Sequence, residues 1–374
     1  MSGPARVFRT SFVPPARLGR AVERTRHHLV RLHQRLLPAP MSMMELIVSG
    51  WPAQAITTAA QLGIADALAD GPLPLDELAA RVGADADALR RLLRALIGRG
   101  IFRRRRDGRY ALNSLAATLR SDAPISLKGA ALFQGSQEQR ERWTLLADSV
   151  RTGQSIVPAL RGKEGFDYLA DIPLHAELFN QTMTSLAQMT LAIVVASYDF
   201  AAHRTIVDVG GGQGAMLAAI LAAAPRSRGV LYDLPRVVAT APTLLRENNV
   251  ADRVRIAEGS FFDGVPTGGD AYLLKNIIHD WADEKALQIL RNVRAAAGRR
   301  STVLLVEMVV RENGRDGPEN WVDLEMLLNL GSRERTAEEY RKLLRQAGFR
   351  MTRVVPTASP LSVVEAVVEE TAPA

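Results

Sequence analysis

Apolar runs of strand length alternate with helical segments along residues 204–369, and this alternation limits the possible fold more than any other feature of the chain. The runs are RTIVDVG (204–210), RGVLYDLP (228–235), RVRIAEG (253–259), DAYLLKNII (270–278), STVLLVEMV (301–309), FRMTRVV (349–355) and LSVVEAVVE (361–369). Helical segments fall at 214–224, 236–249, 282–298 and 336–347. The alternation predicts an α/β fold, a largely parallel sheet with helices on both faces that closes in a hairpin. Ligands of such sheets bind beyond the carboxyl ends of the strands.

The first of these strands ends in DVGGGQG, residues 208–214, a glycine turn that begins with an aspartate. Glycine lets a backbone bend sharply and approach a ligand closely. Gly210, Gly212 and Ala215 fit the loose dinucleotide pattern, so the turn alone leaves two cofactors open, a dinucleotide and S-adenosylmethionine. Charge favours S-adenosylmethionine, because Asp208 would repel a pyrophosphate and attract an ammonium or sulfonium group.

The next two strands also end in residues that suit a nucleoside. Asp233 ends the second strand, where an acid accepts hydrogen bonds from ribose hydroxyls in both cofactor classes, and Leu234 follows it. The alternative role for Asp233 is a helix cap, and the two roles are compatible. Gly259, Ser260 and Phe261 follow the third strand, where an adenine ring would lie, although Phe261 is equally well explained as a core residue.

His279 comes just after the fourth strand, in LLKNIIHDW, and is therefore expected near the same crevice. Histidine has an ordinary pKa of about 6.5 and is a common general base. A single histidine is more often structural, but this one stands at a strand's carboxyl end, where acidic residues are expected to converge. Asp280 and Asp283 follow it, and their alternative role is to stabilise a helix N-terminus. No spacing typical of metal ligands surrounds His279, so no metal is predicted.

Residues 1–40 form a basic arm that carries the whole formal net charge of +7, with eight arginines, no lysine and one acid, Glu23. Helical spacing runs over 17–37. We interpret the arm as a solvated helical extension that packs on a partner subunit. Binding to nucleic acid or anionic lipid is the alternative.

Residues 41–122 contain two helical segments and a short hairpin in the order of a winged helix. One helix starts near Asp76, the second covers 85–99, and IFRRRRDGRYALN (101–113) forms the hairpin. Winged helices often bind DNA, and Arg103–Arg106 would lie on the wing. The second helix has few polar side chains that could contact base edges, so dimer contacts are the preferred role and no nucleic-acid partner is expected.

Composition and the remaining segments complete the prediction. Residues 123–200 are expected to be a helical linker that lines a substrate pocket, and 201–374 the cofactor-binding domain.

The chain has no cysteine, which rules out disulfides, thiolate metal sites and a cysteine nucleophile. No stretch reaches the ~18 apolar residues of a membrane span, and the N-terminus lacks the apolar region of a secretory signal, so a cytoplasmic location is expected.

Five motifs, DVGGGQG, LYDLP, EGSFF, LLKNIIHDWADEKAL and SRERTAEEYRKLLRQAGF, occur in this order and at familiar spacing. Together they resemble the S-adenosylmethionine-dependent small-molecule O-methyltransferases, the caffeate and hydroxyindole O-methyltransferase type that includes bacterial polyketide-tailoring members. The resemblance covers residues 43–370. It implies a Rossmann-like class I methyltransferase domain with a mixed seven-stranded sheet, preceded by an α-helical winged-helix dimerisation domain. It also implies S-adenosylmethionine as the cofactor, a homodimer and no metal.

The resemblance further implies roles for single residues. A histidine base matches His279, and two glutamates that orient it match Glu307 and Glu334. Positions near the cofactor match Lys275, Asp280 and Met183, the last packed against the methyl-donor end. The chain departs from the family pattern at Ser260, where many members have an aspartate, and the basic arm lies outside the pattern.

The predicted activity is methylation of a hydroxyl, preferably phenolic, on a small aromatic or polyketide-like metabolite. Several alternatives stay open: a hydroxylase, a decarboxylase, an N- or C-methyltransferase, a winged-helix DNA-binding regulator, and an NAD-dependent oxidoreductase that Asp208 disfavours. The residues expected to line the acceptor pocket are Trp143, Phe166, Phe179, Asn276, Asp280, Met326 and Asn329. The sequence does not identify the acceptor.

Overall fold

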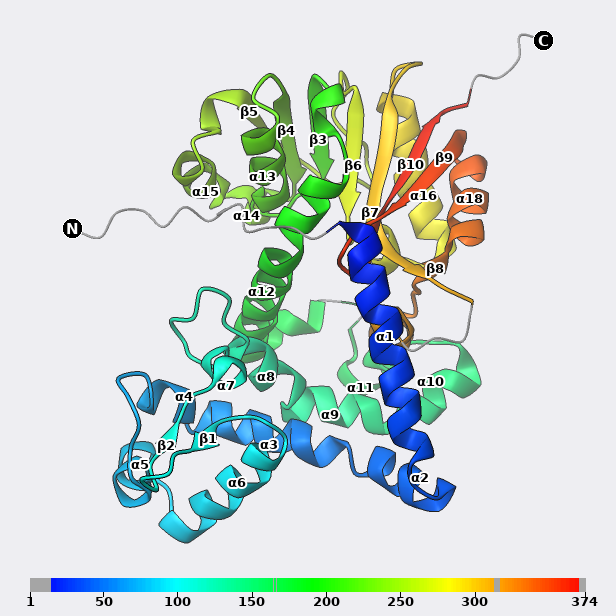
Figure 1. Cartoon of the computed structure of the whole chain (residues 1–374). Coiled ribbons are helices and arrows are strands. Elements are labelled where there is room, and N and C mark those ends of the chain that lie inside the picture. Colours follow the sequence, from blue (N-terminus) through cyan, green and yellow to red (C-terminus); the bar gives the residue numbers. More distant parts are fainter. Residues whose placement is uncertain (1–14, 164, 166, 313–316, 370–374) are drawn as a thin grey trace. The chain divides into compact units, whose positions relative to one another are not determined.

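The structure is a computed structural model that describes residues 15–163, 165, 167–312 and 317–369 (Figure 1). These residues form two compact units. The first unit comprises the described parts of 1–27, 148–157 and 190–374, and the second comprises those of 28–147 and 158–189. The division into 1–40, 41–122, 123–200 and 201–374 stays a prediction from sequence character.

An eight-stranded sheet forms the centre of the first unit (Figure 1). Its strands are β3 (Thr205–Val209), β4 (Arg228–Asp233), β5 (Val254–Glu258), β6 (Ala271–Lys275), β7 (Thr302–Val310), β8 (Arg335–Thr336), β9 (Phe349–Pro356) and β10 (Leu361–Val368). Their order is β5–β4–β3–β6–β7–β10–β9, and β8 pairs with the end of β7. Only β10 runs antiparallel to its neighbours, β7 and β9. The predicted mixed sheet is confirmed, and the two-residue β8 is an addition to its seven strands.

The strand order reverses between β3 and β6, because the chain leaves β3 toward β4 and leaves β6 toward β7. In open α/β sheets such a reversal opens a crevice at the carboxyl ends of the two strands. The glycine turn follows β3 and the segment with His279 follows β6. The fold therefore brings the two predicted parts of the site to the same edge.

Helices cover both faces of this sheet. They are α13 (Ala215–Ala223), α14 (Pro235–Val238), α15 (Ala241–Glu247), α16 (Asp283–Ala296), α17 (Pro318–Leu330) and α18 (Ala337–Gln346), with short 3-10 turns η2 (Phe200–Ala202), η3 (Ala251–Arg253) and η4 (Ile278–Asp280). Successive strand residues point to opposite faces, so Val207 packs with α16 and α18, whereas Ile206 packs with α13 and α15. The single helix predicted over 236–249 is two helices, and α17 was not predicted.

The second unit is mainly helical. Its elements are α2 (Ala39–Ile47), α3 (Gly50–Gln61), α4 (Ile64–Ala67), α5 (Leu75–Val82), α6 (Ala86–Gly98), β1 (Arg103–Arg104), β2 (Tyr110–Ala111), α7 (Ser114–Ala117), α8 (Lys128–Gln134), α9 (Gln137–Thr144) and η1 (Asp167–Asp171). Helices α1 (Ala16–Arg35), α10 (Leu146–Thr152), α11 (Val157–Arg161) and α12 (Pro173–Ser197) each have residues in both units. The order α5, α6 and hairpin is the one on which the winged-helix prediction rested. Asp85 caps α6, since its side chain accepts a hydrogen bond from Ala88 N.

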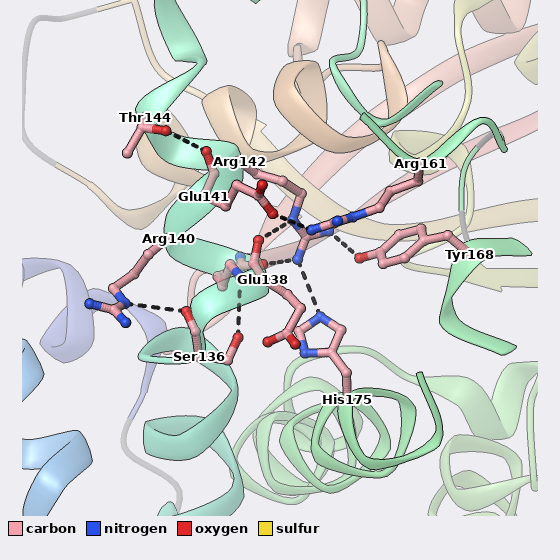
Figure 2. A network of polar contacts seen from close by, with 10 residues as sticks. Ser136, Glu138, Arg140, Glu141, Arg142, Thr144, Arg161, Tyr168 and His175 are labelled. Atoms are coloured by element: carbon pink, nitrogen blue, oxygen red, sulfur yellow. Dashed lines mark hydrogen bonds and ion pairs between the residues drawn. The ribbon is translucent and has the colours of Figure 1, made fainter. Parts of the chain in front are cut away.

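A buried polar network ties α9 to η1 and α12 within the second unit (Figure 2). The guanidinium of Arg142 bonds to Tyr168 Oη and Gln139 Oε1 and lies 3.3 Å from His175 Nε2. Because a guanidinium can only donate, this contact makes Nε2 the acceptor and places the proton of a neutral His175 on Nδ1. Burial lowers the pKa of His175 and Arg142 adds to that shift, which favours the neutral ring.

No helix among the described residues is both long and apolar enough to cross a membrane.

Candidate active site

The glycine turn after β3 can be built only from residues without a side chain. Gly210 and Gly212 have φ angles of +69° and +62°, in the left-handed region that glycine tolerates best. A methyl group on Gly211 would lie 2.5 Å from Leu231 Cδ1 and 2.6 Å from Asp208 Oδ2. Packing therefore keeps the surface of the turn as bare backbone, as a closely bound cofactor requires.

Asp208 lies buried below this turn. Burial raises the pKa of Asp208 to about 7, although the nearby ammonium of Lys275 acts in the opposite direction. Its Oδ2 atom is buried and has no hydrogen-bond partner among the described residues. An unpartnered buried carboxylate oxygen favours a cationic ligand group. The carboxylate of Asp208 therefore suits the cationic groups of S-adenosylmethionine and would repel a pyrophosphate.

Asp233 links the end of β4 to the glycine turn. Its Oδ2 accepts a hydrogen bond from Gly212 N at 2.8 Å, and its Oδ1 accepts one from Leu234 N at 2.7 Å. The N-cap of the following helix is Leu234, so Asp233 lies one residue before the cap position and does not cap that helix. Each carboxylate oxygen keeps a second lone pair, so ribose hydroxyls can still donate to it.

Residues after β5 lie against the same turn. Phe261 is half-buried, and its ring meets Trp281 edge-on with centroids 6.1 Å apart. A methyl group on Gly210 would lie 3.4 Å from Phe261 Cε1, so the ring borders the turn as well as the core. Gly259 has a φ of +155° and packs on Tyr232, and Ser260 Oγ accepts a hydrogen bond from Phe262 N at 3.2 Å.

The turn η4, which carries His279, is held from both sides by buried charged side chains. Glu307 Oε1 accepts hydrogen bonds from Ile277 N at 3.1 Å and Ile278 N at 2.8 Å. Arg335 donates to Ile278 O and to Trp281 O, each at 2.8 Å. The arginine is 1% exposed, so its contacts are shielded from water. Glu307 thus orients the backbone of the turn that carries His279, a less direct contact than that of Glu334 with the ring.

Within this turn the imidazole contacts two carboxylates. His279 Nδ1 lies 2.6 Å from Glu334 Oε1, and Nε2 lies 3.3 Å from Asp280 Oδ1. Glu334 is itself placed by Asp323 of α17, whose Oδ1 accepts a hydrogen bond from Glu334 N at 2.8 Å. The expected pairing of His279 with Glu334 is present, and Glu334 joins β8 to the site.

The surroundings of His279 raise its pKa above the ordinary value for histidine. Burial by itself lowers the pKa of His279, but three surrounding carboxylates outweigh burial and raise that pKa to about 10. These carboxylates belong to Asp280, Glu307 and Glu334. Burial in turn raises the pKa of Asp280 to about 6 and that of Glu307 to about 7. The pKa of His279 thus lies above the ordinary value of 6.5 assumed from the sequence, and its role as the base stays a prediction.

Two further features concern charge near the ring. Lys275, at the end of β6, has a pKa lowered by burial, and the nearby carboxylates of Asp208 and Glu307 act in the opposite direction.

Ligand atoms of His279, Glu307 and Glu334 all lie within 4.8 Å of one another, a spacing that could hold a metal ion and that the sequence did not suggest. The direct contact of Nδ1 with Glu334 is also what a positioned base requires, so metal-independent chemistry stays a prediction for the protein.

The predicted acceptor-pocket residues are divided between the two units. Asn276 follows β6 with a φ of +52°, and α17 carries Met326 and Asn329. Asn329 donates to Glu325 O at 2.9 Å, while its own side-chain oxygen is buried and has no hydrogen-bond partner among the residues that the structure describes. Trp143 and Phe179 belong to the second unit, as does Met183, which the resemblance places near the cofactor, and Phe166 lies outside the described residues. Their roles stay predictions.

Sequence reasoning missed Arg335 and Asp323. Arg335 stands beside Glu334 in SRERT, a neighbouring position that could have singled it out. Asp323 is in a helix that the apolar pattern did not predict, so no local signal pointed to it.

Comparisons with known proteins identify the family of this chain. A family model described as the O-methyltransferase domain matches residues 143–350, and one described as the O-methyltransferase dimerisation domain matches residues 44–122. The chain belongs to the O-methyltransferase family. The phenazine O-methyltransferase PhzM of Lysobacter antibioticus is 39% identical over 330 residues, 88% of this chain and 96% of that protein.

Two other relatives bear on the cofactor and the reaction. The crystal structure of CalO1, a methyltransferase in calicheamicin biosynthesis in its SAH-bound form, matches with a TM-score of 0.80 at 34% identity, over 88% of this chain and 98% of that one. The 8-amino-8-demethylriboflavin N,N-dimethyltransferase of Streptomyces davaonensis is 37% identical over 314 residues, 82% of this chain and 89% of that protein. The chain described in Figure 1 is thus an O-methyltransferase that uses S-adenosylmethionine and acts on small-molecule natural products, as the sequence resemblance implied.

Proposed function

We propose that this O-methyltransferase methylates a phenolic hydroxyl of a small aromatic or polyketide-like metabolite, with His279 as the general base. The observation that carries the proposal is the 2.6 Å contact between His279 Nδ1 and Glu334 Oε1 at the carboxyl edge of the sheet. A carboxylate at that distance fixes the ring with a proton on Nδ1 and leaves Nε2 to accept one.

The chemistry assigned to the side chains follows from proton affinities. A phenol has a pKa of about 10, so at neutral pH it is a poor nucleophile until a base removes its proton. S-adenosylmethionine, when bound, supplies a methyl group activated by a cationic sulfur. Nε2 of His279 takes the hydroxyl proton as the oxygen attacks, and Glu334 stabilises the imidazolium that forms. Glu307 contributes through the backbone of the turn that it holds.

The base can act only while its ring is neutral. The raised pKa of His279 favours a protonated ring at neutral pH. A positive charge beside the ring disfavours the imidazolium, so the pKa of His279 falls when the site is loaded. We therefore propose that cofactor binding and release of the proton from His279 are coupled.

The proposal is tested with the full chain and a labelled methyl donor. A screen of phenolic, quinonoid and flavonoid compounds first identifies an acceptor. His279→Ala should then lower kcat at least ~100-fold, the usual contribution of a general base, with little change in the affinity for S-adenosylhomocysteine measured by calorimetry. The matched control is His33→Ala, an exposed histidine of α1, which should leave both quantities unchanged. Near-normal turnover of His279→Ala on the true acceptor would show that the base is another group.

N-methylation is the second candidate, because a relative with 37% identity is named as an N,N-dimethyltransferase. An amine acceptor needs less help from a base, since its neutral form is already a nucleophile. Mass and NMR analysis of the product distinguishes transfer to oxygen, nitrogen or carbon. It also detects a hydroxylated or decarboxylated product.

The dimerisation-domain match over residues 44–122 supports a homodimer, which we propose as the working form of the enzyme. We keep the acceptor-pocket assignments and the cytoplasmic location as parts of this proposal.

A further inference from the structure

Helix α1 lies outside both family matches, the first of which begins at residue 44, and it contains no buried residue (Figure 1). Its twenty residues carry most of the basic arm, and they are strongly amphipathic. A surface helix of this kind normally turns its apolar side toward the protein and its polar side toward water. The contacts of α1 show the opposite arrangement.

The polar side of α1 is the side attached to the first unit. Glu23, the only acid of the arm, accepts hydrogen bonds from both terminal nitrogens of Arg311, each at 3.0 Å. Arg311 also donates to the buried Glu319 at 2.9 Å. One turn earlier, a methyl group on Gly19 would lie 3.1 Å from Ala358. A two-bond arginine–carboxylate pair and a close backbone approach thus fix this side of the helix.

The apolar side of α1 faces away from these contacts. Leucine and valine side chains follow one another at intervals of three or four positions, with Thr25 completing the series. At 100° per residue they fall in one narrow stripe, and Gly19 and Glu23 lie on the other side of the helix. The stripe consists of Leu18, Val22, Leu29, Leu32 and, just past the helix end, Leu36, which are 50% to 73% exposed.

This apolar surface continues along the chain into the matched dimerisation domain. The side chains that follow the stripe are also more than half exposed, namely Met41, Met43, Met44, Leu46, Ile47 and Trp51. The last four of them lie within residues 44–122. Many large exposed apolar side chains in one stretch of the chain are typical of an interaction surface.

We propose that the stripe of α1 is covered by a second copy of this chain, so that the basic arm enlarges the interface of the dimerisation domain. The inference rests on the homodimer proposed above and not on the reaction that the enzyme catalyses. The regular alternation of three and four positions is the spacing of helix-to-helix packing, which favours a folded protein partner over a lipid surface.

The test compares two full-length variants that change the net charge of α1 by the same amount on different sides. Leu29→Glu with Leu32→Glu places two charges on the stripe, whereas Arg31→Glu reverses one charge beside it. Sedimentation over a concentration series should show a dimer dissociation constant at least ten-fold higher for the stripe variant. The control should stay within two-fold of the parent chain. Equal dissociation constants for all three, or a parent chain that is monomeric, would overturn the proposal.

Hydrogen exchange gives a second measurement that does not depend on the variants. Amides of residues 16–35 should become more protected as the parent chain is concentrated through its dimerisation range. Protection that is independent of concentration would contradict the proposal. So would a stripe variant that dimerises normally but no longer binds phosphatidylserine vesicles, because the stripe would then be a lipid-binding surface.

Discussion

The guanidinium of Arg335 contacts several parts of the candidate active site. It bonds to the carbonyl groups of Ile278 and Trp281 and to Asp283 Oδ1 at 2.7 Å. These contacts enclose His279, while the adjacent residue in the chain, Glu334, contacts the ring. Two adjacent residues, one at the start of β8 and one just before it, therefore set the position of the base and supply its orienting carboxylate.

We expect Arg335→Met to lower kcat strongly and to affect S-adenosylhomocysteine binding little. The substitution leaves two buried carbonyl groups without donors, at a cost of roughly 1–3 kcal/mol each, so the turn would move. Arg335→Lys should rescue only part of the rate, because an ammonium cannot span both carbonyls as a planar guanidinium does. The control is Asp283→Asn, which keeps the carbonyl contacts. A kcat for Arg335→Met close to that of the parent enzyme would argue against this positioning role.

The pH dependence of the reaction should reflect the acidic surroundings of His279. A base with a raised pKa is protonated and inactive at low pH, so kcat/KM should increase with pH. The midpoint should lie above 6.5, the ordinary value for histidine, because the pKa of His279 in the free enzyme is raised to about 10. Initial rates between pH 6 and 10 measure this limb. Removing one of the three carboxylates by Asp280→Asn should move the midpoint toward lower pH, and an unchanged midpoint would contradict the assignment.

At the scale of elements, the strand–turn–helix unit from β3 to α13 prepares the cofactor site before any ligand arrives. The apolar residues of β3 fill both cores, and Asp208 stands among them at the start of the glycine turn. Asp233 at the end of β4 bonds to the backbone of the same turn at Gly212. The turn is thus fixed from below and from the neighbouring strand.

Gly211→Ala should weaken S-adenosylhomocysteine binding about ten-fold or more. The new methyl group would lie 2.5 Å from Leu231 Cδ1 and 2.6 Å from Asp208 Oδ2, so the carboxylate or the turn must move. Overpacking of this kind costs about 1–3 kcal/mol, and 1.4 kcal/mol corresponds to a factor of ten. Gly264→Ala is the matched control, because nothing lies within 4 Å of the added methyl group. Calorimetry measures the affinity of both variants for S-adenosylhomocysteine. Equal affinities would show that the turn accommodates the added methyl group without loss of binding.

At the scale of the whole molecule, charge is distributed unevenly between a basic arm and the rest of the chain. The formal net charge of +7 belongs entirely to residues 1–40, so residues 41–374 are neutral overall. The single acid of the arm, Glu23, pairs with Arg311, which also pairs with Glu319. The helix of this basic arm is therefore held in part by its one acidic side chain, and the proposed partner for its apolar stripe is a second chain.

Much of the fold follows from the sequence alone, because it depends on local patterns. The alternation of apolar runs and helical segments gave the mixed sheet and its flanking helices, and the DVGGGQG turn with Asp233 gave the cofactor edge. These features have short-range causes: side-chain period, glycine conformations and the position of an acid at a strand end. The family resemblance, which linked His279 with Glu334, was also contained in the order and spacing of the motifs.

Only the tertiary structure decided how these parts act on one another. The sequence placed Glu307 near His279, and folding adds its hydrogen bonds to two backbone amides of the turn. It could not indicate that Arg335 would be buried around that turn, or that three carboxylates would raise the pKa of His279. The reason is physical: burial and the distance between charges depend on residues far apart in the chain, and no local period records them.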